Sequence, residues 1–135
     1  MKTILVVDDN PDVIKSLKIG LDESTGEYRI LGAENGYECL ELLNDNIIPD
    51  IILLDIMMPR MSGWEVFDRI KKDPSLSTIP VIFLTARTDR IAKNAGGFLG
   101  DDYIEKPFDI IDLKKRMEIV FRNKKSKNIL NKKDH

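Results

Sequence analysis

The sequence contains only one cysteine, Cys39, and only one histidine, His135. One cysteine excludes an intramolecular disulfide and a cysteine-based zinc cluster. Cys39 lies in a helical pattern between Tyr37 and Leu43, which favours a small buried apolar role over a reactive thiol. With the only histidine at position 135, we expect neither a histidine-based catalytic triad nor a catalytic zinc site.

Long apolar runs and a strong excess of one charge are also missing. No stretch approaches the roughly 20 apolar residues of a membrane span. The short run before Asp8-Asp9 does not resemble a signal-peptide core, so we expect a cytoplasmic protein without a membrane partner. The formal net charge of −2 gives no global basic field, so we expect no direct nucleic-acid binding by the main domain.

Short apolar runs rich in β-branched residues recur along the chain. They do not alternate with polar residues, which is typical of strands buried on both faces of a parallel sheet. Four runs are clear and the fifth is weak: Ile4–Val7, Tyr28–Leu31, Ile51–Leu54, Val81–Leu84 and Tyr103-Ile104.

Helical patterns fill the gaps between these runs. Three predicted helices begin at a capping residue, which is Asn10 before Pro11, Ser62 or Asp109. The weakest helix prediction is Thr88–Leu99, because adjacent glycines lower its helix propensity. The apolar positions of the predicted helices are Val13, Leu17 and Leu21; Cys39, Leu40 and Leu43; Val66, Phe67 and Ile70; and Ile110, Leu113, Met117 and Val120 or Phe121.

Strands alternating with helices indicate right-handed βαβ units and a parallel sheet with helices on both faces. Five such units predict an α/β, doubly wound, flavodoxin-like (βα)5 fold with strand order 2-1-3-4-5. The length of 135 residues suits one domain, which we place at residues 1–122. Residues 123–135 are predicted to be a basic tail, either a helix extension or a linker.

Cations crowd the region around this tail. Cations suit the negative end of a helix dipole, so a solvated helix end is the ordinary interpretation. A linker to an output domain and a basic arm that contacts nucleic acid stay open as alternatives. The residues are Arg122, Lys124, Lys125, Lys127, Lys132 and Lys133.

Reactive residue types follow the predicted strands. They are Asp8-Asp9, Asp55, Thr85-Ala86 and Lys106-Pro107. In an open α/β sheet, ligands bind outside the carboxyl ends of the strands. Each motif alone has an ordinary explanation as a turn or a cap. Together they crowd carboxylates that repel one another unless a cation is present, and Mg²⁺, with Mn²⁺ as the alternative, suits such oxygen ligands.

The sequence resembles a response regulator receiver domain over about residues 2–121. The resemblance rests on several motifs in the order of the family. They are the acidic pair Asp8-Asp9, the phosphoacceptor Asp55 with Met58-Pro59 and Gly63, the switch residues Thr85-Ala86 and Tyr103, and Lys106-Pro107-Phe108.

This resemblance implies a signalling domain rather than an enzyme. A sensor histidine kinase or phosphotransfer protein would donate a phosphoryl group to Asp55 in a Mg²⁺-dependent reaction. The metal would bind through Asp9, Asp55 and the backbone carbonyl of Met57, with Asp8 holding a coordinated water. The implied phosphoryl contacts are Lys106, Thr85 and the amides of Ile56 and Ala86, and Pro107 is the candidate for a cis peptide bond.

The resemblance also implies a two-state output. The hydroxyl of Thr85 would move toward the phosphoryl group while Tyr103 turns inward. A plain interface tyrosine is the alternative role for Tyr103. The changed surface would be the fifth strand with its flanking helices, and a homodimer partner or a downstream protein would bind there.

Three other functions fit the sequence less well. An interaction module that is never phosphorylated, the main alternative, would be expected to lack an acidic residue, the threonine or the lysine. A hydrolase of the haloacid dehalogenase type would need an aspartate where Met57 stands. A flavin carrier would need a glycine- and hydroxyl-rich loop where Asp8-Asp9 stands.

Overall fold

The computed structural model describes residues 1–21, 23–86 and 101–133, with the side chains of residue 23 and of those beyond 125 left out. The helix predicted at Thr88–Leu99 lies outside the described residues. In chain order the elements are β1 (Lys2–Val7), α1 (Pro11–Gly20), the 3-10 helix η1 (Glu23–Thr25), β2 (Tyr28–Ala33), α2 (Gly36–Asn44), β3 (Ile51–Asp55), α3 (Gly63–Lys72), β4 (Val81–Thr85), β5 (Asp102–Glu105) and α5 (Ile110–Lys133).

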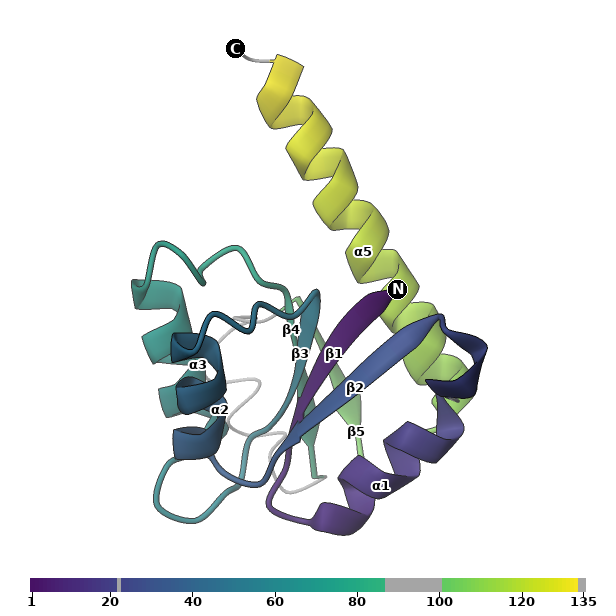
Figure 1. Ribbon diagram of the computed structural model, residues 1–135, viewed down its shortest axis with the longest axis vertical. Coiled ribbons are helices and arrows are strands. Elements are labelled where there is room, and N and C mark those ends of the chain that lie inside the picture. Colours follow the sequence, from purple (N-terminus) through teal and green to yellow (C-terminus); the bar gives the residue numbers. More distant parts are fainter. Residues whose placement is uncertain (22, 87–100, 134–135) are drawn as a thin grey trace.

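The strands form one parallel sheet in the order β2-β1-β3-β4-β5. The predicted flavodoxin-like strand order is therefore confirmed. Helices α2 and α3 cover one face of the sheet, while α1 and α5 lie on the other (Figure 1). The fold is a three-layer sandwich in which all strands end at the same edge.

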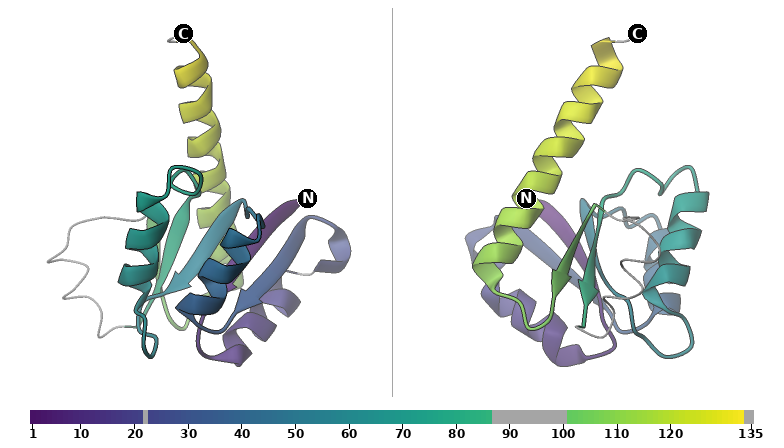
Figure 2. Two further views of the ribbon diagram at one scale, coloured as in Figure 1. Left: turned by 60° about the vertical axis from the view of Figure 1, so that its left-hand side comes forward. Right: turned by 180° about the vertical axis from the view of Figure 1, so that it is seen from behind.

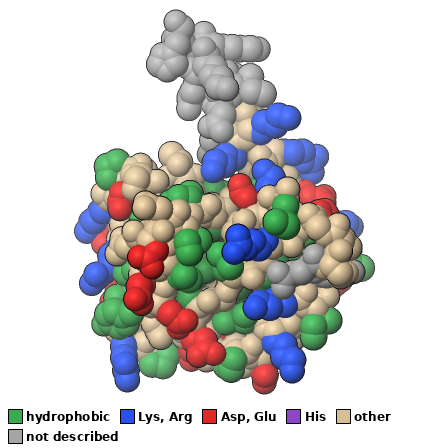
Figure 3. Space-filling view, in the orientation of Figure 1, with side chains coloured by type: hydrophobic (Ala, Val, Ile, Leu, Met, Phe, Trp, Pro, Cys, Tyr) green, Lys and Arg blue, Asp and Glu red, His purple; other side chains and the backbone are tan. Residues whose placement is uncertain are grey.

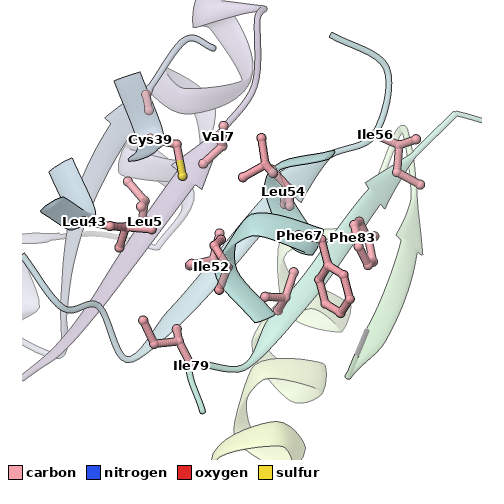
Figure 4. Close-up of a cluster of buried hydrophobic side chains, with 14 of the residues drawn as sticks. Leu5, Val7, Cys39, Leu43, Ile52, Leu54, Ile56, Phe67, Ile79 and Phe83 are labelled. Atoms are coloured by element: carbon pink, nitrogen blue, oxygen red, sulfur yellow. The ribbon is translucent and has the colours of Figure 1, made fainter. Parts of the chain in front are cut away.

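Apolar side chains fill both spaces between the layers. Successive strand residues point to opposite faces, so Leu5 and Ile52 pack toward α2 and α3 (Figure 4), whereas Ile4 and Ile51 pack toward α1 and α5. The central strands β3 and β4 are thus buried on both faces, as their uninterrupted apolar runs predict. The edge strand β2 differs, because Arg29 is exposed on it.

The predicted capping residues begin three helices. Oδ1 of Asn10 accepts a hydrogen bond from the Asp12 amide at 3.0 Å. The Ser62 hydroxyl and the Asp109 carboxylate accept equivalent bonds at the starts of α3 and α5. The inner face of α1 is shifted from the expected one, because Ile14 and Leu17 are its buried residues and Val13 is only partly buried.

Helix α5 is long and continues past the body of the domain, as Figures 1 and 2 show. It crosses position 122 without a break, so the division into residues 1–122 and 123–135 stays a prediction. Among the described residues, no helix combines the length and apolar character that a membrane crossing requires.

Candidate functional site

Four of the predicted site residues lie where the parallel strands end. Asp8 follows β1, Asp55 ends β3, Thr85 ends β4 and Lys106 follows β5. The strand register keeps these positions level, because Val7 lies beside Leu54 and Asp55 beside Leu84. The sheet thus brings together residues that are nearly a hundred positions apart in sequence.

The resulting pocket is acidic with one lysine. Asp8 is fully buried and Asp55 is 5% exposed, and each contributes an oxygen that lies within 4.8 Å of the others and of one from exposed Asp9. The ammonium nitrogen of Lys106 lies 2.6 Å from Oδ2 of Asp8 and 3.4 Å from Oδ1 of Asp55. Among the described residues, Lys106 is therefore the cation that faces this group of three carboxylates.

These surroundings shift two ionisation equilibria. Burial and the charge of Asp8 raise the pKa of the Asp55 carboxyl to about 7, although Lys106 opposes the shift. Burial lowers the pKa of Lys106, but contact with Asp8 and the charge of Asp55 outweigh it, so this pKa is raised overall. The pocket favours Lys106 as a cation and holds a proton on Asp55 up to unusually high pH.

The donor atoms suit a divalent cation. Oδ2 of Asp8 is buried and forms an ion pair with Lys106. Within the described residues, however, no donor forms a hydrogen bond with this oxygen. The other oxygen of Asp8 accepts a hydrogen bond from the Asn10 amide at 2.9 Å. Because hard cations prefer several carboxylate oxygens, the three aspartates form a cluster of the kind that holds such an ion.

The turn after β3 has a tight backbone contact. A Cβ atom on Gly63 would lie 2.3 Å from the Asp55 carbonyl oxygen, which no real side chain could do. The Gly63 amide donates a hydrogen bond to the Ile56 carbonyl at 2.7 Å. The backbone after Asp55 is thus held directly against the start of α3.

The two predicted switch residues lie on neighbouring strands. The Thr85 hydroxyl is buried and donates to the Ile104 carbonyl at 3.4 Å. The Tyr103 ring is also buried and stacks on Phe83 with a centroid distance of 5.3 Å. In this structure the tyrosine already points inward and is not part of an exposed surface.

The remaining predicted site residues differ in their exposure and in their hydrogen bonds. The Ile56 amide donates to the Leu84 carbonyl at 3.2 Å, so a phosphoryl contact there would have to replace a sheet bond. Met57 is exposed, Ala86 is half-buried, and the Lys106–Pro107 peptide bond is cis. Beside Lys106 opens an apolar groove of about 460 Å³ between α1 and the start of α5.

Sequence reasoning missed the aromatic neighbours of Tyr103. Trp64 lies 4.7 Å from Phe83 and 6.3 Å from Tyr103, measured between ring centroids. Phe83 is marked by the sequence only as a core residue of a strand, and Trp64 only as an early helix residue. Nothing in the local pattern connects either with Tyr103, because all three come from different elements.

Residues 4–118 match the family model of the response regulator receiver domain. The chain belongs to this family. The matched residues are therefore a receiver domain, which is a signalling module.

The chain is similar to parts of longer proteins. Over 129 residues the chain is 46% identical to a probable cyclic di-GMP phosphodiesterase of Vibrio cholerae, covering 95% of this chain and 28% of the relative. It is 41% identical over 122 residues to the phosphate regulon transcriptional regulatory protein PhoB of Pseudomonas aeruginosa, covering 90% and 52%. The chain thus spans about half or less of these relatives.

A solved structure shares the fold over most of its length. The receiver domain of a signal transduction histidine kinase from Syntrophus aciditrophicus superposes with a TM-score of 0.78 at 32% identity, covering 91% of this chain and 92% of that one.

Proposed function

We propose that this receiver accepts a phosphoryl group on Asp55 from a histidine kinase or a phosphotransfer protein, in a Mg²⁺-dependent reaction. The observation that carries the proposal is the pocket itself, in which Asp55 shares one sheet edge with Asp8, Asp9 and Lys106. Membership in the receiver family supports the choice of donor.

The transfer needs Asp55 as an ionised nucleophile. One of its carboxylate oxygens attacks the phosphorus atom while the bond to the donor histidine nitrogen breaks, and the product is an acyl phosphate. The nitrogen leaves with the electron pair of the broken bond. Lys106 favours ionised Asp55 and can pair with a phosphoryl oxygen, which Thr85 can also approach.

The aspartate cluster explains the metal requirement. Asp9, Asp55 and the Met57 carbonyl would hold Mg²⁺, or Mn²⁺ in its place, and Asp8 would hold a coordinated water. When bound, the ion would neutralise negative charge on the phosphoryl oxygens. The metal would also supply the positive charge that Lys106 alone cannot provide for three carboxylates.

The phosphorylated state is expected to alter the face around β5. Replacing the Thr85 bond to Ile104 by a bond to the phosphoryl group would disturb β5 next to Tyr103. This face is the proposed contact for a homodimer partner or a downstream protein. An interaction module that is never phosphorylated remains the second candidate, but it requires neither Lys106 nor Thr85 at the pocket.

Intact mass spectrometry after incubation with acetyl phosphate and Mg²⁺ tests the proposal. The wild-type chain and the control Asp68→Asn, which changes an exposed aspartate of α3, should each gain one phosphoryl group. Asp55→Asn should gain none, because the amide nitrogen is not a nucleophile for this transfer. No adduct on the wild type would identify the non-phosphorylated module instead. An adduct on Asp55→Asn would place the phosphoryl group on another residue and overturn the assignment to Asp55.

A further inference from the structure

The edge of the sheet opposite the acidic pocket carries a cluster of cations, which we name the basic cradle. It consists of Lys2, Arg122, Lys124 and Lys125, which line a cavity of about 540 Å³ together with Asp50 and Phe121. The side chain of Lys2 in β1 reaches the Phe121 ring of α5. Basic side chains gather at the base of the protruding part of α5 on the face shown in Figure 3. The cradle therefore joins the start of β1 to the middle of α5.

The helix dipole does not explain these cations. A dipole attracts positive side chains only within the last turn of a helix. Helix α5 continues to Lys133, so Lys125 lies eight residues before its end and Arg122 lies further still. By contrast, Arg69, Lys71 and Lys72 lie in the last turn of α3, where the dipole does account for them.

The charges of the cradle are not neutralised within the described part of the chain. None of its four cations has a carboxylate partner there, and Asp50 uses one oxygen to accept the Thr3 amide at 2.7 Å. Lys2 lies over the Phe121 ring, with its nitrogen 4.9 Å from the centroid. This contact positions a cation but leaves its charge available.

Further cationic residues follow the cradle in the sequence of α5. Six of the twelve residues from 122 to 133 are Lys or Arg and none is Asp or Glu. The rest of the chain has fifteen cationic and twenty-three acidic side chains. A long polyanion would therefore be attracted to this end of the molecule and repelled from the pocket around Asp55.

We propose that the basic cradle and the helix beyond it bind the phosphate backbone of double-stranded nucleic acid without reading its sequence. A membrane surface fits poorly, because residues 122–133 include only Ile129 and Leu130 as apolar residues and so lack a continuous apolar face. An acidic protein would need apolar anchors, and among the described residues that line the cradle only Phe121 is apolar. Lys2 covers that ring, which also removes it as a platform for unpaired bases.

Binding of a labelled DNA duplex of random sequence to the intact chain, measured by fluorescence anisotropy over a range of salt concentrations, tests this proposal. Each phosphate contact should contribute about −0.9 to the slope of log K against log salt. Arg122→Gln/Lys124→Gln/Lys125→Gln should weaken binding at least tenfold at low salt and reduce the slope by about 2 to 3.

The α3 cluster offers a matched control. Arg69→Gln/Lys71→Gln/Lys72→Gln removes the same number of charges from the exposed end of α3, and it should leave both affinity and slope nearly unchanged. Equal losses in the two variants would show a mere net-charge effect and overturn the proposal. So would the absence of duplex binding at low salt, or equally tight binding to polyglutamate or to anionic lipid vesicles. Thermal melts confirm that both variants are folded.

Discussion

At the scale of single residues, Lys106 balances the charge of the acidic pocket. Its ammonium group lies between two buried carboxylates. Because Asp8 is not exposed to water, solvent cannot compensate its charge if the lysine is removed. A buried charge that loses its partner is strongly destabilising, whereas an exposed ion pair contributes little. The lysine is thus needed for the fold as well as for the proposed chemistry.

We therefore expect Lys106→Met to lower the free energy of unfolding by about 2 to 4 kcal/mol at neutral pH. Lys72→Met, which removes the exposed pair with Asp68, should change it by less than about 1 kcal/mol. Urea denaturation of both variants measures the difference. Equal stability of the two variants would mean that Asp8 finds another partner.

Met57 is the second residue with a testable role. It is exposed and lies two positions after Asp55, and we propose that it stands beside the path of the water that hydrolyses the acyl phosphate. A bulky apolar side chain should hinder that water, so Met57→Asn should shorten the phosphorylated lifetime several-fold. Loss of the phosphoryl group followed by mass spectrometry measures it, and an unchanged or longer lifetime would contradict the hypothesis.

At the scale of elements, the connection from β3 to α3 positions the nucleophile. Gly63 begins α3 and touches the backbone of Asp55 so closely that no side chain fits between them. Because the obstacle is backbone at the centre of the sheet, it cannot move aside as a flexible side chain can. The pocket thus depends on a residue that contributes no functional group.

Gly63→Ala should lower the free energy of unfolding by about 2 to 4 kcal/mol and slow phosphorylation, since overpacking moves the backbone that carries Asp55. Gly20→Ala is the matched control, because its new Cβ would meet only the Ile110 side chain and alanine favours a helix. Thermal melts and acetyl phosphate labelling of both variants measure these effects. Normal labelling of Gly63→Ala would contradict the positioning role.

At the scale of the whole molecule, the pocket couples stability to pH and to metal. The folded-state pKa of Asp55 is about 7, compared with about 3.9 for an unfolded aspartate. A group whose pKa is raised by folding stabilises the protein below its unfolded pKa, and this contribution disappears as the pH rises through the folded value. The metal-free protein should therefore lose stability between about pH 4 and pH 7.

Asp55→Asn isolates this contribution. Relative to the wild type without metal, the variant should gain about 2 to 4 kcal/mol of stability between pH 4 and pH 8, because the asparagine does not ionise. Mg²⁺ should stabilise the wild type at neutral pH by mass action, and the variant less. Urea unfolding at several pH values checks both. A melting temperature indifferent to Mg²⁺ would argue against the metal site.

Much of the fold could be predicted because its signals are local. Uninterrupted apolar runs identify strands buried on both faces, and capping residues such as Asn10 and Ser62 identify where helices begin. The same runs place Asp8, Asp55 and Thr85 at strand ends, so the candidate pocket follows from the strand order. Edge effects were harder to predict, as the exposed Arg29 of β2 shows, because burial depends on neighbours that the local sequence does not specify.

The sequence by itself determined three helix starts and the residues offered to the pocket, since each depends on hydrophobic periodicity and on the chemistry of one or two neighbouring residues. The strand order followed from the alternation of strands and helices. Only the tertiary structure decided the short Lys106–Asp8 distance, the raised pKa of Asp55, the backbone contact at Gly63 and the stacking of Trp64, Phe83 and Tyr103. These properties arise between elements that are distant along the chain, where packing and desolvation set distances and charges that no local pattern encodes.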